Sequence, residues 1–215
     1  MTCPSTGRPG GAGLARREVA ELASREIEIR LCGVGGQGLL VAGAILAEAL
    51  TLEGLRVAQS QSFEPTSRGG MSRTDLVASD AAVDFPLATA LDCALILDQI
   101  AAFPTAGLVK RGGLVLLDRD RVPRPPDGDF ALRSLALSEL AKGLGDARVA
   151  NLVGLGVLTR LAELCSDASL DRAIRSTSPA RFVDLNLEAA RAGRSLTKAT
   201  ATASSAAIAE AGRQR

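Results

Sequence analysis

The sequence predicts an α/β fold, in which a mostly parallel sheet lies between layers of helices. Short apolar runs of the buried-strand type alternate with longer segments whose apolar residues recur at helical spacing. A glycine-rich turn at residues 33–38 also joins the first such strand to the first such helix. Because strand, crossover helix and strand form the repeating unit of parallel sheets, we expect a layered domain.

The first strand and helix flank this turn. Residues 27–31 alternate apolar and polar side chains, which is the period of a strand. From Leu39 to Leu50 the apolar residues follow the 3.6-residue period of a helix. The turn therefore points the free N–H groups of a helix start at whatever lies above it.

The later segments continue the alternation and end in helices. Further strands are expected at residues 56–59, 72–78, 93–97 and 114–117. Polar, proline-containing loops are expected at residues 60–70 and 122–129. Helices are then expected at residues 134–142, 152–164, 170–175 and 179–192. We therefore expect the C-terminal part of the fold to be helical.

Composition predicts one domain with two tails. Residues 1–24 begin rich in Pro and Gly and are expected to form a flexible arm, residues 25–195 the domain, and residues 196–215 a low-complexity tail that is frayed or loosely helical. No apolar run approaches the roughly 20 residues of a membrane span. Scattered cysteines without a secretory signal indicate a reducing cytoplasm.

Several classes of chemistry are disfavoured. The formal net charge of +1 argues against a general nucleic-acid binder. The chain has no His, which is the commonest general base and metal ligand. Its four cysteines (Cys3, Cys32, Cys93 and Cys165) are widely spaced, whereas iron–sulfur and structural zinc sites need clusters. The chain is therefore poorly equipped for redox chemistry on its own.

The glycine turn permits two explanations. Gly33, Gly35 and Gly38 match the spacing of a dinucleotide-binding turn. That mechanism also needs an acid at the end of the second strand to hold the ribose, but residues 59–61 contain none and Glu53 comes too early. The other explanation is that the glycines only allow a tight turn and close helix packing.

A second unusual segment is the loop that ends in Arg68, Gly69 and Gly70. An arginine beside bare backbone can hold a phosphate or carboxylate with its planar fork. Alternatively, Arg68 pairs with an acidic residue and braces the loop. The residues alone favour neither explanation.

Two asparagines and two glycines mark the helical part. Asn151 stands directly before a helical segment and is expected to be its N-cap, which stabilises by about 1 kcal/mol. Gly154 and Gly156 would permit close packing of one helix face. Asn186 is expected to serve as polar packing or as an interface contact.

Taken in order, these motifs resemble the gamma subunit of 2-oxoacid:ferredoxin oxidoreductases over about residues 27–195. The matching pieces are Gly35-Gly36-Gln37-Gly38, Ala42-Gly43, Gln61-Ser62-Phe63, Pro65, Arg68-Gly69-Gly70, Ser79-Asp80, Asp84-Phe85-Pro86, Asp92, Asn151 with Gly154, and Asn186 with Gly193. Phe63, Glu64 and Thr66 depart from the Tyr, Gly and Glu that are common in the family. The segments 72–75 and 84–86 look most like the 2-oxoglutarate branch.

The resemblance implies a Rossmann-like three-layer sandwich within a cytoplasmic complex. That complex would convert a 2-oxoacid and coenzyme A into an acyl-CoA, carbon dioxide and reduced ferredoxin. Thiamine diphosphate would lie between the alpha and beta subunits, Mg²⁺ would also lie in the partner chains, and iron–sulfur clusters would lie in other chains or domains. A delta subunit is a further candidate partner. No nucleic acid or membrane partner is implied.

The site residues follow from the resemblance together with the chemistry of the turn. The candidates for contact with coenzyme A or a neighbouring subunit are Gly33, Gly35, Gly36, Gln37, Gly38, Arg68, Gly69 and Gly70. No catalytic residue or metal ligand is expected in this chain. Two alternatives are a stand-alone nicotinamide-nucleotide dehydrogenase and a non-catalytic scaffold domain.

Overall fold

A six-stranded sheet forms the centre of the structure, a computed structural model that describes residues 26–64, 70–83, 85 and 87–211. The order of its strands is β2-β3-β1-β4-β5-β6. The strands are β1 (Glu26–Val34), β2 (Arg56–Phe63), β3 (Met71–Ser79), β4 (Leu91–Ile96), β5 (Val109–Asp118) and β6 (Ala131–Leu135).

Five of the six strands point the same way. β1, β4, β5 and β6 pair in parallel, whereas β3 runs antiparallel to both β1 and β2. The chain leaves β1 toward β2 on one side of the sheet and later returns to β4 on the other side. The carboxyl ends of β1 and β4 therefore meet at a topological switch point, where α/β sheets commonly bind ligands.

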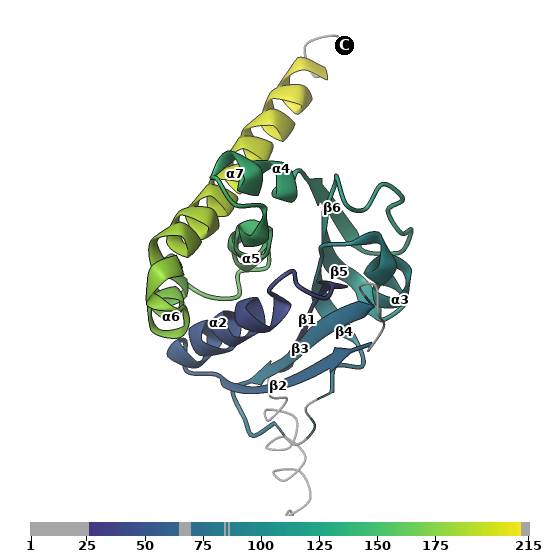
Figure 1. Cartoon of the computed structure of the whole chain (residues 1–215). Helices are drawn as coiled ribbons and strands as arrows, with labels where there is room; N and C mark the ends of the chain where they lie inside the picture. The colour runs from purple at the N-terminus through teal and green to yellow at the C-terminus, as the bar shows by residue number, and fades with distance from the viewer. Residues whose placement is uncertain (1–25, 65–69, 84, 86, 212–215) are drawn as a thin grey trace, which may run out of the picture.

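The helices form two unequal layers (Figure 1). The helices are α2 (Leu39–Leu52), α3 (Ala102–Ala106), α4 (Leu137–Gly143), α5 (Ala150–Leu161), α6 (Asp167–Thr177), α7 (Val183–Ala211) and three short 3-10 helices, η1 (Gln99–Ala101), η2 (Ala147–Val149) and η3 (Ala180–Phe182). α2 and α4–α7 lie over one face of the sheet, and η1 with α3 lies over the other. α7 continues outward beyond the sandwich.

The core is aliphatic because strand residues alternate between the two layers. Ile29 and Leu31 of β1 pack under the larger helical layer, while Cys32 packs under α3. The largest fully buried side chains are Leu and Ile, with one Arg. Burying each such aliphatic side chain contributes roughly 1.5–3 kcal/mol, so the sandwich is stable without large aromatic residues.

The one Arg belongs to a buried ion pair under the smaller layer. Arg30 and Asp75 lie opposite each other on β1 and β3. The guanidinium of Arg30 donates two hydrogen bonds, of 2.7 and 2.8 Å, to the Asp75 carboxylate, and both side chains are almost completely buried. Removing either partner would leave an uncompensated buried charge, which is strongly destabilising.

The structure confirms the predicted α/β class and corrects several element boundaries. β2 extends to Phe63, into the expected loop. Residues 134 and 135, expected in a helix, instead end the edge strand β6. α7 continues to Ala211, through most of the expected tail. The expected N-terminal arm lies outside the described residues. Among the described helices, none is long and apolar enough to span a membrane.

Candidate functional site

The glycine turn (residues 33–38) lies where β1 ends and α2 begins. Gly36 and Gly38 have φ values of +88° and +68°, a left-handed conformation that glycine adopts without steric cost. Gly38 caps α2 without a side-chain hydrogen bond. The first N–H groups of α2 therefore face the carboxyl edge of the sheet.

The Gln37 side chain links the turn by hydrogen bonds to the ends of β1 and β4. Its Oε1 accepts a hydrogen bond of 2.8 Å from the Val34 N–H, and its Nε2 donates one of 3.0 Å to the Leu97 carbonyl. A Cβ at Gly33 would collide with this amide. A glycine is therefore needed at position 33 because any side chain there would displace the Gln37 amide.

Asn151 holds the other side of the turn. Its Nδ2 donates a hydrogen bond of 2.9 Å to the Gly38 carbonyl, and its Oδ1 accepts one of 2.8 Å from the Leu152 N–H. The N-cap of α5 is Val149, so the prediction of Asn151 as that N-cap is wrong. Asn151 instead connects α5 to the start of α2. A Cβ at Gly38 would lie 2.5 Å from the Asn151 amide nitrogen.

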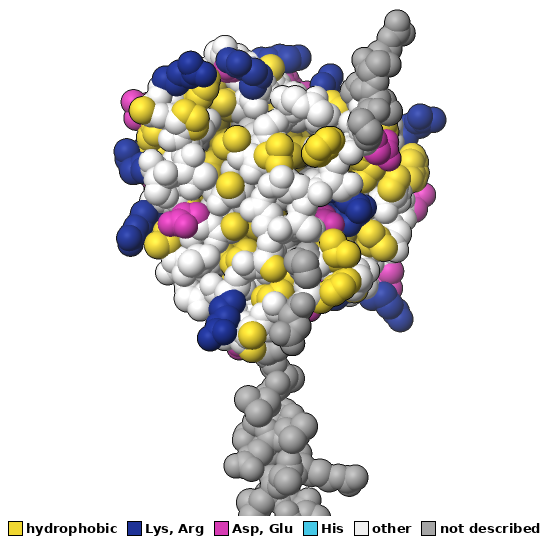
Figure 2. All heavy atoms as spheres, turned by 60° about the horizontal axis from the view of Figure 1, so that its bottom comes forward, with side chains coloured by type: hydrophobic (Ala, Val, Ile, Leu, Met, Phe, Trp, Pro, Cys, Tyr) yellow, Lys and Arg dark blue, Asp and Glu magenta, His cyan; other side chains and the backbone are white. Residues whose placement is uncertain are grey.

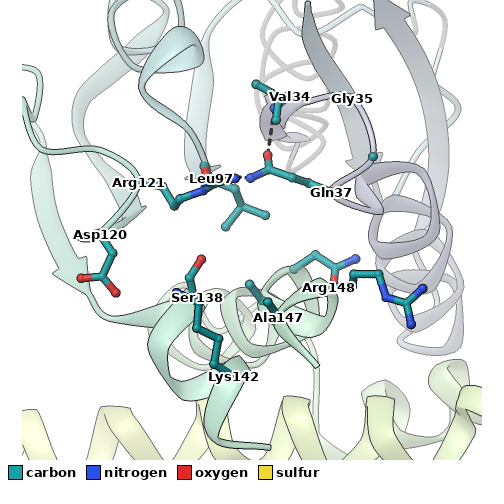
Figure 3. Close-up of a pocket in the computed structure, with 13 residues that line it drawn as sticks. Val34, Gly35, Gln37, Leu97, Asp120, Arg121, Ser138, Lys142, Ala147 and Arg148 are labelled. Atoms are coloured by element: carbon teal, nitrogen blue, oxygen red, sulfur yellow. Dashed lines mark hydrogen bonds between the residues drawn. The ribbon is translucent and has the colours of Figure 1, made fainter. Parts of the chain in front are cut away.

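A cavity of about 520 Å³, the main cavity, opens in front of the turn (Figure 3). Its lining residues come from the turn, from the end of β4, from the loop after β5, and from α4, η2 and the start of α5. They are Val34, Gly35, Gly36, Gln37, Leu97, Asp120, Arg121, Ser138, Lys142, Ala147, Arg148, Ala150 and Asn151. The main cavity thus occupies the switch point between β1 and β4.

Positive charge dominates the main cavity. Arg121, Lys142 and Arg148 line it, against the single lining acid Asp120, and Arg121 also lies 3.9 Å from the Asp98 carboxylate outside the lining. Arg148 forms an ion pair with Asp146, and the hydrogen bonds from its side chain hold the pKa of Asp146 below the ordinary value. Lys142 has no acidic partner within 4.0 Å among the described side chains. Together with backbone N–H groups, these cations suit an anionic ligand.

Asp118, the last residue of β5, stabilises the wall of the main cavity that is formed by the loop after β5 and by α4. The carboxylate is fully buried and accepts hydrogen bonds from the Ser138 N–H and hydroxyl and from the Asp120 N–H. It therefore fixes the loop that carries Arg121 relative to the start of α4. The structural role of Asp118 was not predicted from the sequence. The signal that could have indicated it is its position directly after a buried apolar run.

The predicted site residues are only partly brought together. Gly35, Gly36 and Gln37 line the main cavity, and the Gly35 N–H donates a 3.3 Å hydrogen bond to the Gly70 carbonyl. Arg68 and Gly69 lie outside the described residues. The three cations of the main cavity were missed, because they stand singly in distant segments.

The structure also weakens the dinucleotide explanation. β3 lies between β1 and β2, so residues 59–61 are two strands away from the turn. An acid at these positions would be too far away to bind the ribose of a nucleotide held by the turn. Within the described residues, no group of three or more Cys, Asp or Glu side chains is arranged to hold a metal ion.

The chain matches known proteins over most of its length. A family profile described as "Pyruvate ferredoxin/flavodoxin oxidoreductase" matches residues 28–196. The 2-oxoglutarate synthase subunit KorC of Methanocaldococcus jannaschii is 37% identical over 175 residues, which are 80% of this chain and 94% of that subunit. The ketoisovalerate oxidoreductase subunit VorA of Methanothermobacter marburgensis is 32% identical over 172 residues, 79% of this chain and 36% of that subunit.

A solved structure supports the same assignment. The gamma subunit of a keto/oxoacid ferredoxin oxidoreductase from Geobacter sulfurreducens PCA superposes with a TM-score of 0.72 at 37% identity, covering 79% of this chain and 94% of that one. The profile match spans most of the sandwich, and the relatives match at similar length. The chain therefore belongs to the pyruvate ferredoxin/flavodoxin oxidoreductase family, as a gamma-type subunit of a 2-oxoacid:ferredoxin oxidoreductase.

Proposed function

We propose that this gamma subunit serves a cytoplasmic complex that oxidises 2-oxoglutarate, and that its main cavity places coenzyme A. The products would be succinyl-CoA, carbon dioxide and two electrons for ferredoxin. The choice of 2-oxoglutarate is supported by the identity with the KorC subunit. Thiamine diphosphate, held between alpha and beta subunits, would supply the decarboxylation chemistry.

One observation carries the coenzyme A assignment: the glycine turn and three cations face the same cavity. Coenzyme A carries phosphate groups that need both backbone donors and positive charge. The Gly36 N–H, which has no hydrogen-bond partner among the described residues, supplies the first, and Arg121, Lys142 and Arg148 supply the second. This chain would thus hold the phosphate end while the thiol reaches a partner subunit.

Kinetics of the assembled complex test this placement. Lys142→Gln and Arg121→Gln should each raise the KM for coenzyme A by roughly tenfold, because a hydrogen bond to a charged group contributes about 1.5–3 kcal/mol. The KM for 2-oxoglutarate and the kcat should change little. Arg111→Gln is the matched control, since Arg111 is 91% exposed and pairs with Asp129 outside the cavity. Equal effects on both KM values would refute the placement.

Arg68 needs a separate test, because it lies outside the described residues. Arg68→Ala should raise the KM for coenzyme A if this side chain shares in phosphate binding. If both this KM and the assembly of the complex stay unchanged, Arg68 has no part in the site.

A further inference from the structure

Among the described strands, β2 is an edge strand with a neighbour on one side only (Figure 1). It pairs with β3 along its whole length in one continuous register. Proteins usually protect such an edge with lysines, a proline, a bulge or a very short strand. From Val57 to Phe63, β2 has none of these. An edge of this kind is suited to pairing with a strand of another chain.

The backbone of β2 presents free hydrogen-bonding groups at alternate residues. The Glu64 N–H donates a 2.9 Å hydrogen bond to the Met71 carbonyl of β3. In an antiparallel ladder the N–H and C=O of one residue point to the same side, and successive residues alternate between the two sides. The even-numbered residues of β2 therefore bond to β3. The residues whose N–H and C=O point away from β3 are Val57, Gln59, Gln61 and Phe63.

The side chains of this segment are complementary to a reversed copy of themselves. Residues 56–64 read Arg-Val-Ala-Gln-Ser-Gln-Ser-Phe-Glu. If a second copy runs antiparallel about a twofold axis at Ser60, Arg56 of each copy lies opposite Glu64 of the other. Val57 then lies opposite Phe63. Opposite charges and aliphatic–aromatic pairs at facing positions stabilise a pair of strands.

The same register also satisfies the backbone. It pairs outward residues only with outward residues, namely Val57 with Phe63 and Gln59 with Gln61, and so forms about eight hydrogen bonds between the copies. A shift by one residue would place outward residues opposite residues that already bond to β3. A shift by two residues would keep the ladder but separate the charges at the strand ends.

The groups at both ends of the segment are available for such a contact. Arg56 and Glu64 are exposed, and neither forms an ion pair within 4.0 Å with another described side chain. Phe63 is 70% exposed. Pairing with a second copy would give both charges a partner and would cover part of the Phe63 ring.

We propose that two copies of this chain join through β2, antiparallel about a twofold axis at Ser60, so that their sheets form one continuous sheet. The partner that this edge fits is thus a second gamma-type subunit, and the complex contains at least two. The inference is independent of the coenzyme A placement, because no residue from 56 to 64 lines the main cavity.

Engineered cysteines test the register in the complex purified through a tag on this chain. Facing residues of a non-hydrogen-bonded antiparallel pair have Cα atoms about 4.5 Å apart, which suits a disulfide bond. After mild oxidation with diamide, Ser60→Cys should therefore shift most of this chain to twice its mass on a non-reducing gel. Ser62→Cys is the matched control, because two copies of position 62 would lie roughly 14 Å apart. The unsubstituted chain shows any linkage through its own cysteines.

Charge reversal tests the contact at the strand ends. In the Ser60→Cys chain, Glu64→Arg places two arginines opposite each other at each end, so the disulfide should form roughly tenfold more slowly. The combined exchange Arg56→Glu and Glu64→Arg restores opposite charges and should restore the rate. Arg133→Glu is the control, because Arg133 lies on β6 at the other edge of the sheet.

Mass spectrometry of the linked peptides identifies the two chains and decides the outcome. Linkage between two copies at position 60 but not at position 62 supports the proposal. No linked dimer from Ser60→Cys, or equal linkage at both positions, would overturn it. A disulfide from position 60 to an alpha or beta subunit would also overturn it, because a different chain would then cover β2. If the charge exchange fails to restore the rate, the proposed register is wrong.

Discussion

At the scale of single residues, substitutions at two positions of the glycine turn should separate an effect on folding stability from an effect on ligand binding. Gly38→Ala combines a left-handed φ of +68° with a Cβ 2.5 Å from the Asn151 amide. The backbone strain alone costs about 1–2 kcal/mol, and displacement of Asn151 adds to it. We expect a clear fall in the midpoint of thermal unfolding, measured by circular dichroism.

Gly35→Ala is the matched control, because it adds the same methyl group to the turn without backbone strain or a collision. Its Cβ would have no atom within 4 Å, and Gly35 has no left-handed φ. The unfolding midpoint should therefore stay near that of the unsubstituted chain, while a new methyl group on the cavity wall changes the KM for coenzyme A. A large loss of stability in Gly35→Ala would contradict this account.

The buried thiols predict a loss of stability at high pH. Burial raises the pKa of the Cys93 thiol from 9.0 to about 12. Between these values the thiol ionises in the unfolded chain but stays protonated in the folded chain, so rising pH favours unfolding. We expect urea titrations to show this decline from pH 9 upward, and Cys93→Ala should lessen its slope. An unchanged slope would show that other groups cause the decline.

The residues of the site were only partly predictable. The turn was visible because its glycines cluster between a strand and a helix. The cations Arg121, Lys142 and Arg148 were not, because each is an ordinary surface residue until the fold brings three segments together. Asn151 was noticed but given the wrong partner, since its hydrogen bond to Gly38 spans 113 residues.

At the scale of elements, the contact between α5 and α7 depends on two glycines. A Cβ at Gly156 would collide with the Ala190 carbonyl, and one at Gly193 would collide with the Val153 carbonyl. The helices can approach this closely only where side chains are absent. The expectation that Gly154 and Gly156 permit close packing is confirmed, because a Cβ at Gly154 would press on Leu95.

Two alanine substitutions in helices should therefore have opposite effects. Gly156→Ala forces α7 away from α5 and should destabilise by roughly 1–3 kcal/mol, as overpacked sites do. Gly143→Ala, at the end of α4 with no atom within 4 Å of the new Cβ, should be neutral or stabilising by up to about 1 kcal/mol. Urea unfolding of both variants measures the difference. Similar changes in the free energy of unfolding would mean that α5 and α7 can move apart without cost.

Element prediction succeeded where burial imposes a pattern. The strands in the middle of the sheet carry continuous or alternating apolar runs, so they were found. β6 was missed because it is a short edge strand whose residues are mostly exposed. The length of α7 was underestimated because its Ala, Ser and Thr residues resemble a low-complexity tail.

At the scale of the whole molecule, several large apolar side chains remain uncovered. Phe63, Phe85 and Phe103 are 70%, 60% and 57% exposed, although the chain has only five Phe. Figure 2 shows hydrophobic side chains spread over the middle of one face, with most Lys and Arg toward its rim. Exposed apolar surface of this kind is typical of contacts with other proteins, which agrees with a gamma subunit that works inside a complex.

The last prediction concerns that dependence on partners. A tagged copy of this chain, purified from its native host, should bring down the alpha and beta subunits. The purified material should reduce a dye only when both 2-oxoglutarate and coenzyme A are present. The same chain produced alone in a foreign host is the control, and it should show no such reduction, because the reacting groups are proposed to lie in the partner chains. Turnover by the isolated chain, or native material without companion subunits, would contradict the assignment; faster reduction with another 2-oxoacid would correct the substrate alone.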